Sequence, residues 1–471
     1  LEFRRVLFRS SFTLEGLMGT PRVVRLPSSL AAGQERQALL TAPISEEILS
    51  RSEGGTATVT ISVSYRRGEF RRSGSLSRQI RLLNRNAIQW DDDRKIGAFM
   101  SVSDQGVLAF GGRVASSAAV TPTPALTRNI LYAMQIFEAL GALGIEYVVD
   151  PNSAYEELSR NTGAVDYLRF PRETLAGGAG DCDDLSALYA TLLESVGVST
   201  ALITTPGHIY TAFDTGMSPG RAQEIFTAPE NLVIFGETAW MPVEATLISE
   251  GFTRAWQVGA LQWRQVAPRG EASIIATGEA WGAYPPVTPP STATIPEINS
   301  GQVRTALARE LDRFRAIELE PRLKRLASDP DRAPSAVTEV KMGVLYARYA
   351  LMEEATDRFQ AALELEETLP ALVNLANVLS LNGRHGEARS YLERARQLYP
   401  QNGRVLLGLA FSYWESGEQE AARAAYEEAR TADPFLAQQF PLFTGPAEAG
   451  GERSSGASSR ASSLFATHSL E

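Results

Sequence analysis

Residues 176–213 read AGGAGDCDDLSALYATLLESVGVSTALITTPGHIYTAF, and this stretch carries the strongest fold signal in the chain. A glycine-rich turn leads into Cys182, the only cysteine among 471 residues, and apolar residues then recur at helical spacing until a glycine ends the pattern. Two short apolar runs follow, residues 200–204 and 209–213, and predict an antiparallel pair of strands. His208, one of three histidines, opens the second strand. We therefore expect a helix that presents a thiol, packed on a strand that presents an imidazole.

This pairing has a functional and a structural interpretation. The first turn of a helix favours a thiolate, because its unpaired N–H groups and positive dipole end stabilise negative charge, and an adjacent imidazole can act as the base. A lone buried cysteine, however, is usually an inert small hydrophobic residue. Asp181, Asp183 and Asp184 surround the thiol and would raise its pKa if their charges faced it. We expect them instead to cap the helix and point to solvent.

Three motifs in this region resemble those of the transglutaminase-like superfamily, namely GDCDDLSALYATLLESVGV, PGHIYTAFD and AWMPVEAT. The resemblance implies a papain-like α+β core in which Cys182 is the nucleophile and His208 is the base. Most members carry an aspartate in the third motif, where this chain has Glu244, with a longer side chain. We assign Glu244 as the residue that orients the imidazole and keep Asp214 as the fallback carboxylate.

The resemblance implies acyl chemistry on amide bonds of a protein or peptide substrate. The Cys182 thiolate would attack a carbonyl, His208 would take and return the proton, and the Cys182 backbone N–H would be the first oxyanion donor. Water as the acceptor makes a cysteine peptidase or amidase, and a primary amine makes a transamidase; we rank the peptidase first. The competing hypothesis is a non-catalytic scaffold of the cell envelope. We expect no cofactor and no metal, since one cysteine and three scattered histidines offer no zinc site.

Composition restricts the remaining possibilities. The formal net charge of −10 argues against nucleic acid as the main partner. No run of 18 apolar residues predicts a transmembrane helix, and a single cysteine excludes an internal disulfide. The chain begins without methionine, so we expect a fragment whose signal peptide cannot be assessed, and residues 1–10 resemble translated sequencing-adaptor read-through. An extracytoplasmic location, in the periplasm or cell envelope, follows only from resemblance to a bacterial subgroup and from the β domain.

Residues 11–114 predict a β-sandwich domain and a junction. Apolar and hydroxyl side chains alternate over 57–65, which is the period of a half-buried strand, and a weaker alternation returns over 70–82. We expect a small, immunoglobulin-like sandwich. Several arginines over 66–85 could bind an anionic ligand, but a solvated edge strand that resists aggregation is the commoner use of such charge.

The rest of the chain divides by composition and repetition. We expect the transglutaminase-like domain over 125–282, a proline-rich linker over 283–298, a helical domain over 299–440 and a disordered tail over 441–471. Small and apolar residues of the helical domain recur after 34 residues, the period of tetratricopeptide repeats, as Ala388, Leu392, Ala395 and Pro400 and then Ala422, Tyr426, Ala429 and Pro434. Three repeats over roughly 337–436 form an all-α solenoid whose concave face could hold a peptide or protein partner; alternatively they only stabilise the neighbouring domain.

Overall fold

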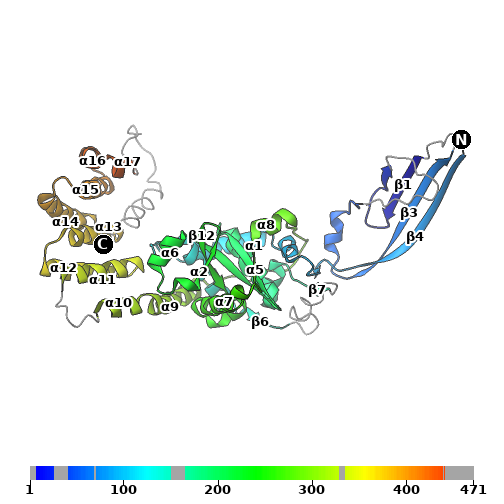
Figure 1. Ribbon diagram of the computed structural model, residues 1–471, viewed down its shortest axis with the longest axis horizontal. Coiled ribbons are helices and arrows are strands. Elements are labelled where there is room, and N and C mark those ends of the chain that lie inside the picture. Colours follow the sequence, from blue (N-terminus) through cyan, green and yellow to red (C-terminus); the bar gives the residue numbers. More distant parts are fainter. Residues whose placement is uncertain are drawn as a thin grey trace.

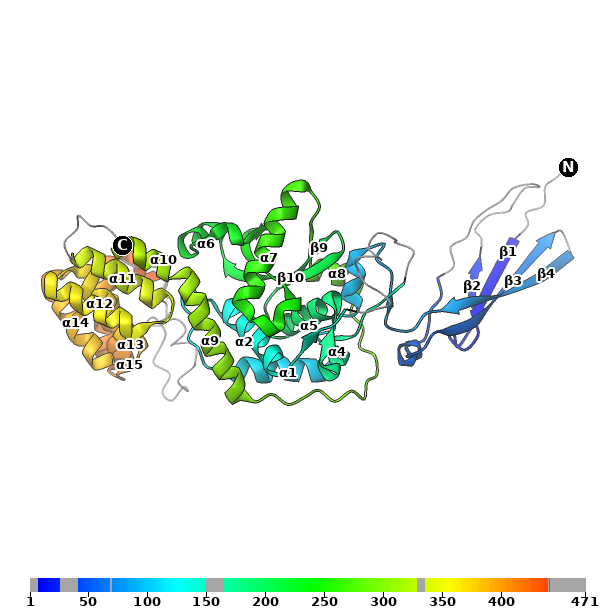
Figure 2. The ribbon, with the colours of Figure 1, turned by 90° about the horizontal axis from the view of Figure 1, so that it is seen from below.

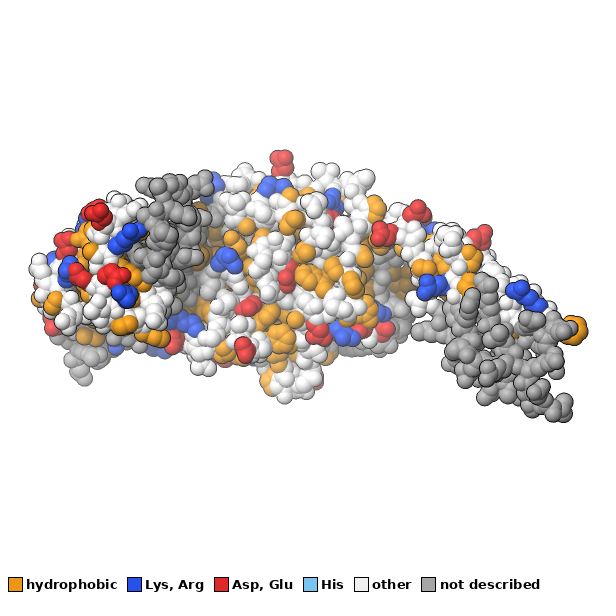
Figure 3. Space-filling view, turned by 90° about the horizontal axis from the view of Figure 1, so that it is seen from above, with side chains coloured by type: hydrophobic (Ala, Val, Ile, Leu, Met, Phe, Trp, Pro, Cys, Tyr) orange, Lys and Arg blue, Asp and Glu red, His pale blue; other side chains and the backbone are white. Residues whose placement is uncertain are grey.

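The computed structural model describes residues 7–25, 41–67, 70–149, 165–327, 335–438 and 440. The chain is elongated, with an antiparallel sheet at one end, a mixed α+β region in the middle and paired helices at the other end (Figure 1). Acidic and basic side chains are interspersed along the face shown in Figure 3. The predicted tail over 441–471 lies outside the described residues.

The N-terminal part is a single sheet that projects from the central region (Figure 2). Its strand order is β2-β1-β3-β4, with β1 (Leu7–Leu14), β2 (Arg22–Arg25), β3 (Gly55–Arg67) and β4 (Phe70–Leu82). Residues 7–10, which lie in the stretch that resembles adaptor read-through, form the first half of β1 and pair with β3.

The predicted sandwich is wrong for the described residues, which form one sheet here rather than two. The alternation in β3 does mark a half-buried strand, but its apolar face is covered by side chains of the same sheet and of the turn after β1, among them Phe12, Leu14, Leu17 and Met18. The side chains of β4 remain exposed along nearly its whole length. The described part of this domain therefore has no second sheet against which β4 could be buried.

The central domain is built on a five-stranded antiparallel sheet of order β11-β12-β10-β9-β13. Its strands are β9 (Thr200–Thr205), β10 (His208–Met217), β11 (Val233–Phe235), β12 (Thr238–Val243) and β13 (Ser273–Ala276). The predicted antiparallel pair around His208 is confirmed as the β9–β10 hairpin. Two short ribbons flank the sheet: β5 (Ala87–Ile88) with β7 (Asp166–Tyr167), and β6 (Glu146–Tyr147) with β8 (Ala179–Gly180).

Helices cover this sheet, and all of them except α8 contribute side chains to one apolar core. They are α1 (Gln105–Ser116), α2 (Arg128–Ala142), α4 (Pro171–Gly177), α5 (Cys182–Ser195), α6 (Pro219–Ile225), α7 (Phe252–Val266) and α8 (Thr277–Ala283). Short 3-10 turns are η1 (Glu46–Ser50), η2 (Asp93–Ala98), η3 (Pro229–Asn231), η4 (Ala245–Glu250) and η5 (Ala267–Arg269). The predicted cysteine helix is confirmed as α5. Helix α1 was not predicted, and its packing extends the central core to before residue 125.

The C-terminal part consists of helices that pair along the chain. They are α9 (Ser300–Glu318), α10 (Glu320–Ala327), α11 (Ala336–Arg348), α12 (Met352–Leu365), α13 (Leu369–Leu381), α14 (His385–Leu398), α15 (Gly403–Glu415), α16 (Gln419–Ala432) and α17 (Pro434–Gln438). Helix α9 belongs to the central core rather than to the solenoid, because Phe314 packs against Trp256 with ring centroids 5.6 Å apart. The predicted proline-rich linker also lies on the central domain, where the Val287 N–H donates to Ala98 O at 2.9 Å.

Candidate active site

The N-terminal turn of α5 lies against a free edge of strand β10. Strand β12 ends at Val243, opposite Thr211, so its pairing does not extend to the first three residues of β10. Helix α5 lies against the start of β10, which β12 leaves unpaired. There Ser186 Oγ donates to Ile209 O at 3.2 Å and Thr211 Oγ1 donates to Ser186 O at 3.1 Å. The Ile209 N–H faces the Cys182 sulfur as a hydrogen-bond donor. The early end of one strand thus brings the thiol to the strand that the histidine opens.

His208 and Glu244 meet on one face of the sheet. Because Val243 pairs with Thr211, Glu244 lies opposite Tyr210, and His208 is its diagonal neighbour on the same face. The His208 Nε2 and Glu244 Oε2 atoms are 2.6 Å apart. Since a carboxylate only accepts, Nε2–H donates this bond, which leaves Nδ1 with its lone pair in the neutral ring.

The Glu244 side chain is nearly fully buried, with 2% of the residue exposed. Its second oxygen, Oε1, accepts from Thr246 N at 3.2 Å and from Thr246 Oγ1 at 2.7 Å. Burial alone would raise the pKa of Glu244, but the hydrogen bond and charge of His208, together with the Thr246 bonds, outweigh it and lower the pKa. Glu244 is therefore ionised near neutral pH and holds the imidazole in one orientation.

Asp214, the fallback carboxylate, is not brought to this imidazole. It lies six residues beyond His208 on β10, roughly 20 Å away along an extended strand. Its Oδ1 accepts from Gly216 N at 2.8 Å, at the irregularity where β10 and β12 lose register. Asp214 therefore serves a turn at the far end of the strand.

The three aspartates at the start of α5 are buried, so the expectation that they point to solvent is wrong. Asp181 does cap the helix, accepting from Asp184 N at 3.3 Å. Asp184 Oδ1 accepts from Arg169 N at 2.7 Å, and burial followed by the charge of Asp181 raises the Asp184 pKa to about 7. Burial and a hydrogen bond with Asp181 raise the pKa of Asp183 well above its ordinary range. Both raised pKa values favour the protonated forms of these carboxyls.

Among the residues that the structure describes, these three aspartates form the group whose geometry could hold a cation. One oxygen from each lies within 4.8 Å of the others. Two features oppose cation binding. The Asp181 and Asp184 oxygens already accept main-chain N–H groups, and the positive end of the α5 dipole points at the cluster. We interpret the cluster as a helix cap that shares a proton.

The resting thiol of Cys182 is neutral. Its residue is 6% exposed, and burial, followed by the charges of Asp183 and Asp181, raises the Cys182 pKa above that of a free thiol. The Ile209 N–H acts in the opposite direction and stabilises the thiolate. A nucleophile at this position must therefore lose its proton to a base during the reaction instead of resting as a thiolate.

Two tyrosines complete the surroundings of the site. Tyr147 lies on β6, which pairs in parallel with the approach to α5; burial and then the nearby Cys182 group raise its pKa. The Tyr210 ring is stacked beside His208, with centroids 5.8 Å apart. Strand alternation could have identified Tyr210, two residues after His208, whereas Tyr147 reaches the site through a long-range strand pairing that leaves no local signal.

The paired C-terminal helices define a protein-binding class of structure. Residues 367–434, from α13 to α16, are a tetratricopeptide repeat, which indicates protein partners. The match covers two of the three predicted repeats; α11 and α12 form a helix pair before it. No curated protein matches the chain. The transglutaminase-like resemblance of the central domain stays a prediction. None of the helices in the described ranges has both the length and the apolar character to span a bilayer.

Proposed function

We propose that the central domain is a transglutaminase-like thiol enzyme that acts on amide bonds of a protein or peptide, and that the helical repeats bind a protein partner. The proposed roles are nucleophile for Cys182, base for His208 and orienting carboxylate for Glu244. The observation that carries the proposal is the 2.6 Å bond between His208 and a buried Glu244, with the thiol held beside the residue that follows the histidine.

The proposed reaction has two halves. His208 Nδ1 takes the thiol proton as the Cys182 sulfur attacks the substrate carbonyl carbon, and the Cys182 N–H at the helix start stabilises the oxyanion. The C–N bond breaks, the imidazolium protonates the leaving amine, and a thioester remains. Water then attacks the thioester, His208 takes its proton and returns one to the sulfur, and the acid product leaves. A primary amine in place of water would complete a transamidation; we rank hydrolysis first.

A second candidate is a scaffold in which this site has no catalytic role. Its support is the burial of Cys182 and the raised pKa of its thiol, both expected of an inert cysteine. The two candidates differ in whether the imidazole accelerates thiol chemistry. Because Cys182 is the only cysteine, any thiol label on this chain reports that atom alone.

The test is the rate of iodoacetamide alkylation at pH 7.5, followed by intact-protein mass spectrometry. We expect His208→Ala to lower the rate at least tenfold, while His385→Ala, on helix α14 of the repeats, leaves it unchanged. Cys182→Ser gives the unlabelled baseline. Equal rates for the wild type and His208→Ala would favour the scaffold. Peptide-library profiling, with and without added primary amines, would then separate hydrolysis from transamidation.

A further inference from the structure

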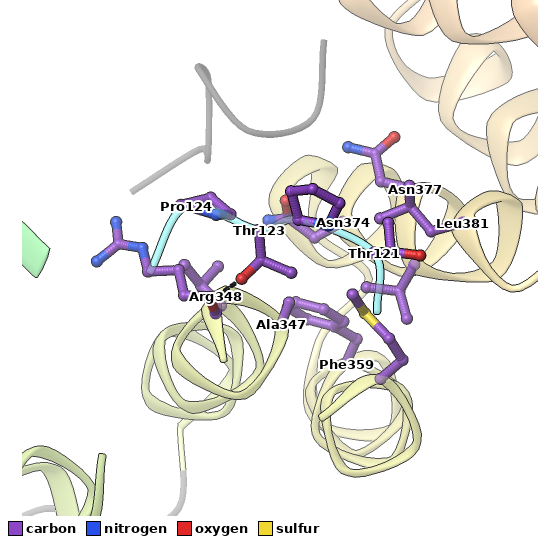
Figure 4. Close-up of a pocket in the computed structure, with 13 residues that line it drawn as sticks. Thr121, Thr123, Pro124, Ala347, Arg348, Phe359, Asn374, Asn377 and Leu381 are labelled. Carbon is purple, nitrogen blue, oxygen red and sulfur yellow. Dashed lines mark hydrogen bonds between the residues drawn. The ribbon is translucent and has the colours of Figure 1, made fainter. Parts of the chain in front are cut away.

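Residues 121–124, Thr-Pro-Thr-Pro, lie across the helices of the first repeat (Figure 4). We refer to them as the strap. Thr123 Oγ1 donates to Arg348 O at 2.6 Å, and the Ala125 N–H donates to the same carbonyl at 3.2 Å. Arg348 is the last residue of α11, where helix carbonyls lack intrahelical partners. The strap therefore satisfies the end of a repeat helix, although it belongs to the central domain in sequence.

The strap covers an apolar groove contributed by three helices. Pro122 and Pro124 of the strap line one cavity together with an apolar wall from α11, α12 and α13 that includes Val344, Ala347, Met352, Phe359, Val378 and Leu381. A cavity of ≈ 60 Å³ remains between the strap and this wall. That volume exceeds what a single water requires, so the groove is not filled by the strap.

One polar group in the groove has no partner. Asn374 on α13 is only 7% exposed, yet its Nδ2 makes no hydrogen bond to any described residue. The side chain lines the cavity beneath the strap. A buried donor without an acceptor is costly, and the carbonyl oxygen of an extended peptide is an acceptor that such a groove can receive.

We propose that this groove is a peptide site whose resting ligand is the chain's own strap, and that a partner protein displaces the strap with an extended, uncharged, proline-rich segment. The seated Thr-Pro-Thr-Pro sequence indicates the chemistry: rings that pack on the apolar wall, a hydroxyl that reaches the end of α11, and little conformational entropy to lose. The partner's main-chain carbonyl would accept from Asn374 Nδ2, which the strap does not use. This proposal does not depend on the thiol chemistry.

The test measures binding of a fluorescein-labelled peptide AAVTPTPALT, the sequence of residues 118–127, by fluorescence polarisation. The full chain is compared with a strap variant that combines Thr121→Gly, Pro122→Ser, Thr123→Gly and Pro124→Ser. We expect the strap variant to bind the peptide at least tenfold more tightly than the wild type, because the competing segment is removed. Adding Asn374→Leu should weaken that binding at least tenfold, and a control peptide AAVTATAALT should bind at least tenfold more weakly.

Three results would overturn the proposal: no peptide binding by a strap variant with wild-type circular dichroism, equal binding of the alanine control peptide, or binding only of a peptide with an acidic C-terminus. If the strap variant does not fold, hydrogen exchange on the wild type decides instead. Excess AAVTPTPALT should accelerate exchange over residues 118–126, and exchange that does not change would refute displacement of the strap.

Discussion

The length of the Glu244 side chain gives the sharpest prediction for the candidate active site. The Glu244 carboxylate reaches His208 along a diagonal of the sheet, and its Oε2 lies 2.6 Å from His208 Nε2. Glu244→Asp removes one methylene, roughly 1.5 Å of reach, and would leave a gap of roughly 4 Å. That separation exceeds a hydrogen bond. An aspartate, which is the residue most transglutaminase-like proteins carry in this motif, should therefore fail in this register.

The expected magnitude follows from the type of bond that is lost. A hydrogen bond to a charged group contributes about 1.5–3 kcal/mol, which corresponds to roughly 10- to 150-fold in a rate if the bond acts fully in the transition state. We expect Glu244→Asp and Glu244→Ala to slow alkylation of Cys182 by such a factor at pH 7.5. Glu244→Gln keeps the length but loses the charge, so its rate should lie between that of the wild type and that of Glu244→Asp.

The assay is the iodoacetamide rate measured over pH 5–9, with Asp214→Ala as the matched carboxylate control. Asp214 is bonded to a turn at the other end of β10, so its removal should leave the rate within twofold of the wild type. A wild-type rate in Glu244→Asp would refute the argument from reach. A larger loss in Asp214→Ala than in Glu244→Ala would transfer the orienting role to Asp214.

Two further predictions concern stability. Burial, the largest cause, raises the pKa of Glu138 to about 7, so the folded chain holds a proton that the unfolded chain releases above its ordinary pKa of 4.5, and stability falls as the pH rises between these values. Glu138→Gln, whose side-chain oxygen can still accept from Phe252 N, should raise the free energy of unfolding at pH 8 by about 3 kcal/mol, seen as a higher thermal midpoint. It should leave the midpoint unchanged at pH 4, and equal shifts at both pH values would contradict this. Ala350 has φ +61° in the turn that Gly383 and Gly417 occupy in the next two repeats. Because a left-handed alanine costs about 1–2 kcal/mol and glycine returns part of that as unfolded-chain entropy, Ala350→Gly should stabilise the α11–α12 pair by about 0.5–1 kcal/mol, seen as slower hydrogen exchange there; faster exchange would refute it.

Local periodicity was sufficient to predict the elements that carry the candidate site. The helix from Cys182 and the hairpin that His208 opens follow from apolar spacing. The helix has the expected bounds to within two residues, whereas β10 continues to Met217, four residues beyond the predicted run. The meeting of these elements depends on where β12 ends relative to β10, which is a property of strand register. No pattern within either strand specifies that register, so the motif resemblance identified Glu244 while the geometry of its contact came only from the structure.

Helix α1 shows how a packing requirement can conceal a helix. Its sequence, QGVLAFGGRVAS, contains three glycines, which normally argue against a helix interior. A Cβ at Gly111 would collide with Ser195 Oγ on α5, so glycine is needed for the close approach of the two helices.

The burial of the aspartates beside Cys182 was missed for a related reason. Residues earlier in the chain reach them, such as Arg169, whose main-chain N–H donates to Asp184, and a cap is solvated only when nothing packs over it.

The strap shows that composition can identify a linker without identifying what the linker binds. Residues 115–124 have the composition of a linker, because Ala, Ser, Thr and Pro in such a run favour loops over helix or strand. That composition does not specify the surface on which the segment lies. The strap is bonded to the repeats through Thr123 and leads along the chain into α2, which begins at Arg128 after the Thr127 cap. Helix α2 packs on the cysteine helix through Phe137 and Tyr189, with ring centroids 5.4 Å apart. Thr127 Oγ1 and Asn129 Nδ2 at the start of α2 also donate to Thr215 O and Asp214 O of β10, so a partner that displaced the strap would leave this helix held by the sheet.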